Sequence, residues 1–299
     1  MMFFYSMEYG PSELVLNPNG SIYHLSLFPG QVADTVIIVG DPGRVEMVSA
    51  FFDSIELRTA NREFVTHTGS YRGKRITVIS SGIGTDNIDI VMNELDALVN
   101  IDLERRDPRP EKRSLDLFRL GTTGGLQRDI PLDSIILSRY ACGFDAVLNF
   151  YADRNRVSDL QMEKAFRDHT GWDPCLPDPY FVRSSDELFS LFPGDVHSGI
   201  TISAPGFYGP QGRKIRLSPL DPHLNDRLET FRYEGMRILN YEMESSALFG
   251  LARLLGHRAI TLCTMIASRT SLEFTGDHRS GVDNLINFTL EHISHLSRP

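Results

Sequence analysis

Short apolar runs, rich in β-branched residues, alternate along this chain with segments whose apolar residues recur at helical spacing. Runs of this kind are typical of strands that are buried on both faces of a sheet. They predict strands at residues 35–39, 75–80, 117–120, 134–137, 199–203 and 259–266. The helical spacing predicts helices at 45–51, 88–99, 159–169, 247–255 and 281–296. The alternation of strands and helices predicts an α/β protein.

The same pattern divides the chain into an arm and a domain. Residues 1–33 are rich in Pro, Gly, Asn and Ser, which predicts an irregular N-terminal arm. Residues 34–299 contain no internal repeat and no clear linker, which predicts a single domain. Within that domain, the charged and proline-containing stretch 101–114 is expected to be a solvated connector.

Polar or glycine-rich segments follow the predicted strands. They occupy residues 40–44, 81–85, 121–125, 204–213 and 267–270. Open α/β sheets bind ligands at the carboxyl ends of their strands, so we expect these segments to converge on one cleft. In the segment 40–44, glycine N–H groups and the start of a helix together favour an anion.

Arginines in these segments also indicate an anionic ligand. Arg44, Arg213 and Arg269 lie in them, and Arg119 lies inside an apolar strand. Burying a guanidinium group is costly unless an anionic group pairs with it. Pairing with a nearby Asp or Glu is one explanation for Arg119. An anionic ligand is the other, and the Thr-Thr-Gly-Gly sequence at 122–125 favours it.

Residues 240–248, Asn-Tyr-Glu-Met-Glu-Ser-Ser-Ala-Leu, place two carboxylates just before a predicted helix. Glu242 and Glu244 can be read as acids at a helix N-terminus, where the helix dipole favours negative charge. A carboxylate also accepts hydrogen bonds from two adjacent hydroxyls at once, such as the cis-diol of a ribose. Met243 would then lie against the apolar face of the sugar.

Composition and charge favour a globular enzyme over a protein that binds nucleic acid or membranes. The 299 residues are 41% hydrophobic and 23% charged with a net charge of −9, which is typical of a globular enzyme. This charge argues against broad binding to nucleic acid or anionic membranes. Cys142, Cys175 and Cys263 are too scattered for a disulfide framework or zinc site, which favours a reduced, cytoplasmic setting. No Lys or Arg precedes Arg44 and no apolar run has transmembrane length, so no signal peptide or membrane span is expected.

Five motifs occur in order between His24 and Thr270. They are Gly-Asp-Pro-x-Arg at 40–44, Arg-Glu-Phe at 62–64, Arg-x-Gly-Thr-Thr-Gly at 119–124, Phe-Tyr-x-x-Gln-x-Arg at 207–213 and Asn-Tyr-Glu-Met-Glu-Ser at 240–245. Together they resemble the nucleoside phosphorylase family, and within it the uridine phosphorylase branch. Gln211, Arg213 and Arg269 look like the pyrimidine branch, because purine enzymes of the family usually carry an Asp near the last position.

The resemblance implies a fold and an activity. The fold would be a three-layer α/β/α single domain with a central mixed sheet. The activity would be a pentosyl transfer in nucleoside salvage and catabolism: reversible phosphorolysis of uridine, or a related pyrimidine nucleoside, to the free base and ribose 1-phosphate. No general acid is then obligatory, because uracil leaves as a delocalised anion.

The resemblance also implies roles for particular residues, of which Arg44, Arg119 and Glu244 would be catalytic. Phosphate would be bound by Gly40, Arg44, Arg119 and Thr122, with Arg62 reaching in from a neighbouring subunit. The ribose would be bound by Glu242, Met243, Glu244 and His24, which would cross a dimer interface to the 5′-hydroxyl. The base would be bound by Phe207, Gln211, Arg213, Ile266 and Arg269.

Partners and cofactors follow from the same resemblance. Inorganic phosphate is the co-substrate, and no metal or organic cofactor is implied. Some relatives hold a potassium ion near the position of Glu63 at the subunit interface. The implied assembly is a homodimer, or a hexamer built from dimers, with shared active sites.

Two departures from the family pattern leave the substrate open. Asp86 and Asp89 stand where the family has a Gly-Pro-Ser-like run, and residues 141–200 match poorly. A purine or methylthioadenosine phosphorylase would use the same phosphate and ribose sites. A nucleoside hydrolase would use water, which needs no arginines. A non-catalytic nucleoside-binding homologue would bind its ligand without turnover.

Overall fold

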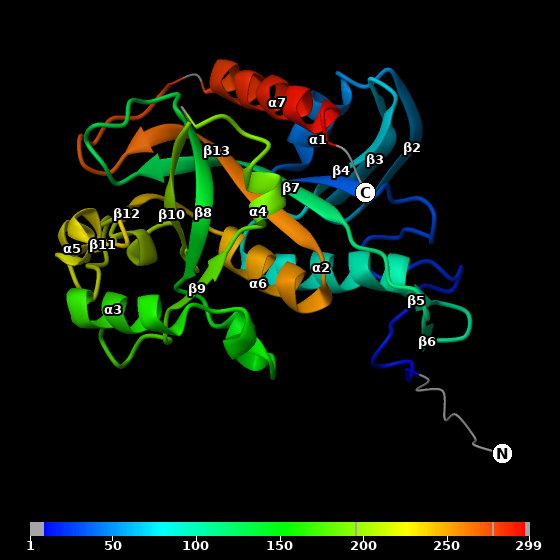
Figure 1. Ribbon diagram of the computed structural model, residues 1–299, viewed down its shortest axis with the longest axis horizontal. Helices are drawn as coiled ribbons and strands as arrows, with labels where there is room; N and C mark the ends of the chain where they lie inside the picture. Colours follow the sequence, from blue (N-terminus) through cyan, green and yellow to red (C-terminus); the bar gives the residue numbers. More distant parts are fainter. Residues whose placement is uncertain (1–8, 195, 277, 297–299) are drawn as a thin grey trace. The chain divides into compact units, whose positions relative to one another are not determined.

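The computed structural model describes residues 9–194, 196–276 and 278–296 (Figure 1). Part of the predicted arm, residues 1–8, therefore lies outside the described residues, as do residues 195, 277 and 297–299 of the predicted domain. The chain forms two compact units. The first comprises Met1–Gly82 and Ile90–Asp116, and the second comprises Ile83–Asp89 and Leu117–Pro299. The boundaries of the arm and of the single domain stay predictions.

The first unit contains a four-stranded mixed sheet. Its elements are β1 (Thr35–Val39), α1 (Pro42–Ser49), β2 (Ser54–Asn61), β3 (Phe64–Tyr71), β4 (Lys74–Ser80), the larger part of α2 (Thr85–Asn100), β5 (Ile101–Asp102) and β6 (Asp107–Pro108). The strand order is β1-β4-β3-β2, with β1 parallel to β4 and the other neighbours antiparallel. Helix α1 begins at Pro42, earlier than predicted. The Asp41 carboxylate caps it by accepting a hydrogen bond from the N–H of Gly43, and proline suits the first helical position.

The second unit contains a larger mixed sheet. Its strands are β7 (Asp116–Gly125), β8 (Ile135–Gly143), β9 (Tyr180–Arg183), β10 (His197–Ser203), β11 (Arg232–Tyr233), β12 (Met236–Glu242) and β13 (Arg258–Ser268). Its helices are α3 (Leu160–Thr170), α4 (Asp186–Phe189), α5 (Leu224–Thr230), α6 (Ser245–Leu255) and α7 (Arg279–Ser294). The order is β11-β12-β10-β8-β13-β7, β9 pairs with β8, and a further pairing of β12 with β7 closes a ring of strands. The predicted α/β class with a mixed sheet is confirmed.

One predicted loop is part of a strand. Gly121–Gly125 was expected to follow the strand at 117–120, but it forms the second half of β7. There, Gly124 and Gly125 pair with Tyr241 and Asn240 of β12. A Cβ atom added at Gly125 would lie 2.5 Å from the sulfur of Met265, so a larger residue there would require the Met265 side chain to move.

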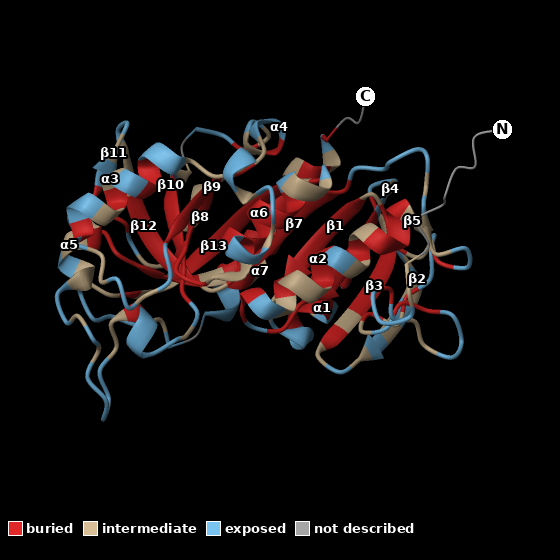
Figure 2. Cartoon of the chain, turned by 90° about the horizontal axis from the view of Figure 1, so that it is seen from below, coloured by how far each residue is buried: buried red, intermediate tan, exposed pale blue. Residues whose placement is uncertain are grey.

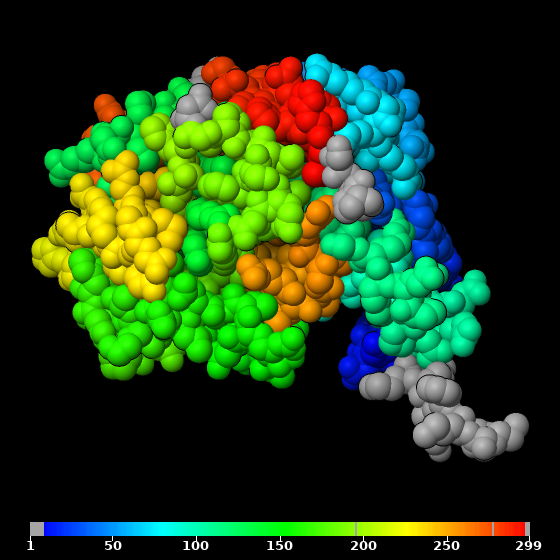
Figure 3. Space-filling view, viewed as in Figure 1, coloured from blue at the N-terminus to red at the C-terminus, as the bar shows by residue number. Residues whose placement is uncertain are grey.

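Residues 141–200, which contain none of the five motifs, build much of the core of the second unit. Phe144, Phe166 and Phe181 are buried in one apolar cluster together with Phe231, and Trp172 packs against it. Figure 2 shows most strands of this unit as buried, and the outer faces of α3 and α5 as exposed. The same two helices contact one another and form neighbouring parts of the surface in Figure 3.

The helix that follows the two glutamates begins at Ser245, two residues before the predicted start, and has the predicted end. Helix α6 ends at Leu255, and Gly256 caps it with φ of 80°, a conformation that glycine adopts without strain. It packs on β8 and β13 of its own unit. Among the helices of the described residues, none combines the length and apolar character needed to cross a bilayer.

Candidate active site

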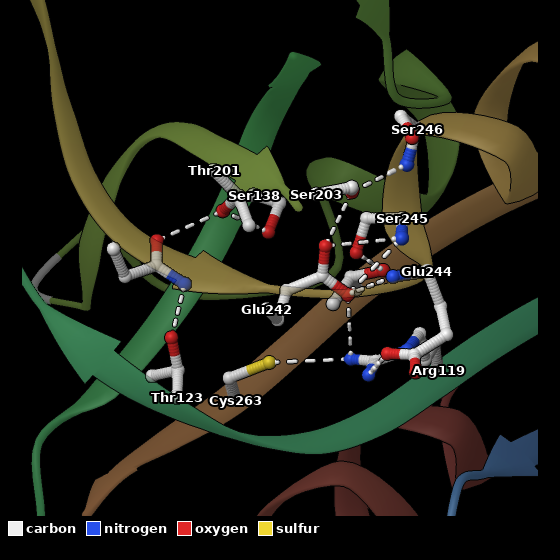
Figure 4. A network of polar contacts seen from close by, with 12 residues as sticks. Arg119, Thr123, Ser138, Thr201, Ser203, Glu242, Glu244, Ser245, Ser246 and Cys263 are labelled. Atoms are coloured by element: carbon white, nitrogen blue, oxygen red, sulfur yellow. Dashed lines mark hydrogen bonds and ion pairs between the residues drawn. The ribbon is translucent and has the colours of Figure 1, made fainter. Parts of the chain in front are cut away.

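Arg119 and the two glutamates form a buried ion-pair cluster in the second unit. Arg119 lies on β7, Glu242 ends β12, and Glu244 precedes α6. The Arg119 Nη1 atom lies 3.1 Å from Glu242 Oε2, and Nη2 contacts Glu244 Oε2 (Figure 4). The exposed fraction of each of these side chains is 5% or less. Acidic partners therefore explain how the guanidinium is buried, and its role in phosphate binding stays a prediction.

The charges of this cluster oppose the effect of burial on Arg119. Burial alone works to lower the pKa of Arg119, but the carboxylates of Glu244 and Glu242 outweigh it and raise that pKa. The pKa of Glu244 is raised, mainly by burial and also by the charge of Glu242, although Arg119 acts to lower it. One cation thus faces two acids, so the cluster favours further positive charge or hydrogen-bond donors nearby.

The two glutamates have different surroundings. The Glu242 carboxylate accepts hydrogen bonds from the N–H groups of Glu244 and Ser245 at 3.0 Å, and from the hydroxyl of Ser203. It therefore caps α6, as the helix-start interpretation predicts. Glu244 occupies the N-cap position but makes no capping bond with its side chain. Its Oε1 atom accepts a hydrogen bond of 2.8 Å from the N–H of Gly84 instead.

A polar network continues from Glu242 into the region where the sequence indicated no chemistry. The Ser203 hydroxyl accepts a hydrogen bond of 2.9 Å from the N–H of Ser246, and the Ser246 hydroxyl donates to Asp145 at 2.7 Å. Tyr180 also donates to Asp145, at 2.7 Å. Burial raises the pKa of this aspartate. The sequence signal for this network was an aspartate two residues after the end of β8.

The predicted base-binding residues of the 204–213 loop lie together with Arg269. Gln211 is buried, and its Oε1 atom accepts a hydrogen bond from Arg213, whose guanidinium lies 3.7 Å from the centre of the Phe207 ring. Arg269 Nη2 donates to the carbonyl of Gln211 at 3.4 Å. A Cβ atom added at Gly124 would lie 3.5 Å from Arg269 and 3.9 Å from Arg213, so β7 lies against both arginines. Burial, and then the charge of Arg269, lower the pKa of Arg213 to about 10.

Three further predicted site residues are half-buried, and each is close in sequence to a residue described above. Thr122 lies within β7, Met243 lies between the two glutamates, and Ile266 lies near the end of β13. A cavity of about 660 Å³ opens beside the loop that carries Gln211, and Arg213 is among its lining residues.

The acids that depart from the family pattern lie in the first part of α2. Asp86 is exposed in the first turn of α2, and Asp89 accepts a hydrogen bond from the hydroxyl of Tyr151. Tyr151 belongs to the region 141–200, which thus holds one of the two acids.

The other predicted site residues belong to the first unit. Gly40 follows β1, and Arg44 is buried in the first turn of α1. Arg62 is exposed at the β2–β3 turn with φ of 53°, and its guanidinium lies 5.6 Å from the centre of the Tyr23 ring. His24 is half-buried, and its Nδ1 atom lies 2.7 Å from Glu94 Oε1.

No group of three or more His, Cys, Asp or Glu side chains is arranged to hold a metal ion in the described parts of the chain. The potassium ion near Glu63 and the lack of an organic cofactor stay predictions.

Comparison with known proteins decides the family. A model of the phosphorylase superfamily matches residues 34–294, which is most of the chain. The chain belongs to the phosphorylase superfamily. The family predicted from the five motifs is therefore confirmed.

Individual relatives of this phosphorylase include both branches. A uridine phosphorylase of Thermococcus kodakarensis is 30% identical over 264 residues, covering 85% of this chain and 80% of the relative. A DeoD-type purine nucleoside phosphorylase of Shewanella denitrificans is 27% identical over 271 residues, covering 90% and 96%. The structure of a Trypanosoma brucei nucleoside phosphorylase, described as showing uridine phosphorylase activity, superposes with a TM-score of 0.86 at 28% identity. It covers 95% of this chain and 100% of its own, so the phosphorylase fold extends over nearly the whole chain.

Sequence reasoning missed two features of the phosphorylase site. Cys263 was given no role in the site, but it is buried and accepts a hydrogen bond of 3.4 Å from Arg119 Nη1. Glu94 was not singled out, although it binds His24. Neither has a local motif.

Proposed function

We propose that this phosphorylase catalyses the reversible phosphorolysis of uridine or a related pyrimidine nucleoside, giving the free base and ribose 1-phosphate. The observation that carries the proposal is the orientation of Gln211. Its Oε1 atom is held by Arg213 and its backbone carbonyl by Arg269. The Nε2 group then donates to a uracil carbonyl, and the second lone pair of Oε1 accepts from the N3–H group. The uridine phosphorylases among the relatives support the same substrate class.

Glu244 is the glutamate that suits the ribose diol. A carboxylate has about four lone-pair positions. Those of Glu242 are taken by Arg119, Ser203 and the N–H groups of Glu244 and Ser245. Glu244 accepts from Arg119 and the N–H of Gly84, so it retains two positions for the 2′- and 3′-hydroxyls.

The chemical step follows from these roles. A phosphate oxygen forms a bond to C1′ while the C1′–N1 bond breaks, and its electron pair moves onto the base. The sugar carries positive charge in the transition state, which the Glu242–Glu244 pair stabilises, and the departing base carries negative charge, which Arg213 and Arg269 stabilise. The base anion takes its proton from water. The predicted phosphate contacts are Gly40, Arg44, Arg119 and Thr122, with Arg62 reaching in from a neighbouring subunit.

The test is base release from uridine, thymidine, inosine and adenosine, with and without inorganic phosphate. We expect phosphate-dependent release of uracil. The DeoD-type relatives make a purine nucleoside the second candidate, and phosphate-dependent release of a purine alone would overturn the base assignment. Release without phosphate would identify a hydrolase, and no release from any nucleoside would favour a binding protein.

The substitution Gln211→Glu tests the base-binding role. The carboxylate still accepts from Arg213 but has no N–H group for the uracil carbonyl, so kcat/KM for uridine should fall about tenfold or more. The KM for phosphate should stay unchanged. Gln161→Glu, on the exposed face of α3, introduces the same charge as a control. Equal activity of the two variants would remove Gln211 from the base site.

The proposal also includes a homo-oligomeric assembly and a cytoplasmic location. A homodimer, or a hexamer of dimers, would let His24 and Arg62 serve a neighbouring active site, and the reducing cytoplasm suits three unpaired cysteines. Light scattering of the purified protein measures the assembly directly, and a monomer with full activity would exclude shared sites.

A further inference from the structure

A single carboxylate organises the chain around His24. Glu94 lies in the part of α2 that belongs to the first unit, and the exposed fraction of its side chain is 13%. It accepts hydrogen bonds from the N–H of His24 at 2.9 Å, from the N–H of Leu25 at 2.8 Å and from the Nδ1 atom of His24 at 2.7 Å. Three donors from two consecutive residues thus converge on one side chain that is 70 positions away in the sequence.

This contact determines which ring nitrogen carries the proton. An ionised carboxylate only accepts hydrogen bonds, so the proton must lie on Nδ1 of His24. The Nε2 atom, on the other side of the ring, makes no hydrogen bond within the described part of the chain. In the neutral ring Nε2 is an acceptor, which matches the hydroxyl of a ligand.

Other contacts fix the position of the ring. The side-chain amide of Asn61 donates to the carbonyl of His24 at 2.8 Å. The ring packs edge-on against Tyr23 and Phe64, with centroids 4.7 and 6.2 Å away. Backbone and side chain of His24 are therefore both held, and 26% of the side chain remains exposed for a ligand.

We propose that Glu94 is a positioning residue for nucleoside binding: it holds His24 with Nδ1 protonated so that Nε2 accepts a hydrogen bond from the 5′-hydroxyl of the nucleoside. The proposal rests on the proposed function, because the 5′-hydroxyl is the group that His24 is expected to contact. Glu94 itself touches no substrate. Its effect passes entirely through the imidazole.

The kinetic test compares uridine with 5′-deoxyuridine, which lacks the hydroxyl. Glu94→Gln keeps the size of the side chain and removes its charge. We expect kcat/KM for uridine to fall about tenfold or more, and that for 5′-deoxyuridine to change less than about twofold. Glu104→Gln, an exposed side chain in the same unit, is the matched control. In a Glu94→Gln/His24→Ala double variant, the loss should not exceed that of His24→Ala alone.

Equal losses with both substrates would overturn the proposal, because they would mean that Glu94 acts only on folding or assembly. An unchanged uridine rate would overturn it as well. A second measurement needs neither turnover nor a variant of Glu94: ¹⁵N NMR of histidine-labelled protein, with the His24 signals assigned by their absence in His24→Asn. Protonated Nδ1 is expected, and a His24 ring protonated on Nε2 alone would contradict the proposal. If wild-type protein releases no base, the proposed function fails while this measurement still decides the role of Glu94.

Discussion

Replacing Arg119 with methionine would leave two buried carboxylates without the cation that contacts both. The exposed fractions of the side chains are 5% for Arg119, 1% for Glu242 and 5% for Glu244, so water cannot replace the lost charge without local opening. Removing one partner of a buried ion pair costs about 3–5 kcal/mol. Because two acids lose one shared partner here, we expect the free energy of unfolding to fall by about 5 kcal/mol, the upper end of that range.

The charge state of the acids should control the size of this loss. Burial already raises the pKa of Glu244, and the loss of Arg119 removes the main group that lowers it. A carboxyl group whose pKa is higher in the folded state than in the unfolded state destabilises the fold as pH rises through the folded pKa. The deficit of Arg119→Met should therefore be larger at pH 8 than at pH 5.5. Adding Glu244→Gln should recover about 2 kcal/mol at pH 8, because one buried charge is gone.

Urea unfolding followed by circular dichroism, in phosphate-free buffer at both pH values, measures these differences. Arg128→Met is the control, because the Arg128 side chain is 76% exposed and its pair with Glu229, at 3.6 Å, is of a kind worth about 0–1 kcal/mol. A loss below about 1 kcal/mol for Arg119→Met would refute the reasoning. So would a deficit that is independent of pH.

Two further predictions concern the surroundings of Arg119 and the buried thiols. A Cβ atom added at Gly121 would lie 2.3 Å from Arg119 Nη1, so Gly121→Ala should cost about 1–3 kcal/mol in urea unfolding and reduce kcat, whereas Gly209→Ala, with open space around it, should change neither. Burial raises the pKa of Cys263 to about 12 and that of Cys142 well above its ordinary value of 9.0. The folded state then holds these protons longer than the unfolded state, so stability should fall as pH rises above 9, by about 1 kcal/mol per thiol at pH 10. Cys142→Ala should show a shallower decline, and identical slopes would contradict the assignment.

The strands that the sequence predicted correctly are those that consist of a short apolar run buried on both faces of the sheet. Residues 35–39 form β1 because a β-branched run buried on both faces has no other stable place in an α/β protein. The strand β2 was missed because its positions alternate between exposed and half-buried, and its apolar signal is weak. The strand β12 was missed because Asn240 is polar, yet it is buried, where its amide donates to Thr123 at 2.6 Å.

The chemistry of the site was predictable where a residue type is stable in few kinds of surroundings. A guanidinium inside an apolar strand required acids or an anionic ligand, and the structure supplies acids to Arg119. Contacts between distant segments were not predictable, because nothing near Glu244 in the sequence indicates the N–H of Gly84 as its partner. The same holds for Glu94 and His24. Only the folded chain brings them together.

The position of Arg119 has a consequence for assigning the phosphate site. Because it pairs with both Glu242 and Glu244, its removal disturbs the predicted ribose ligand as well as any bound phosphate, and lost activity alone would not separate the two roles. The stability of the Arg119→Met/Glu244→Gln pair isolates the ion-pair contribution. A phosphate KM that rises more in Arg119→Met than in Glu244→Gln would then belong to Arg119 itself, since both variants break the contact between these residues but only one removes the cation.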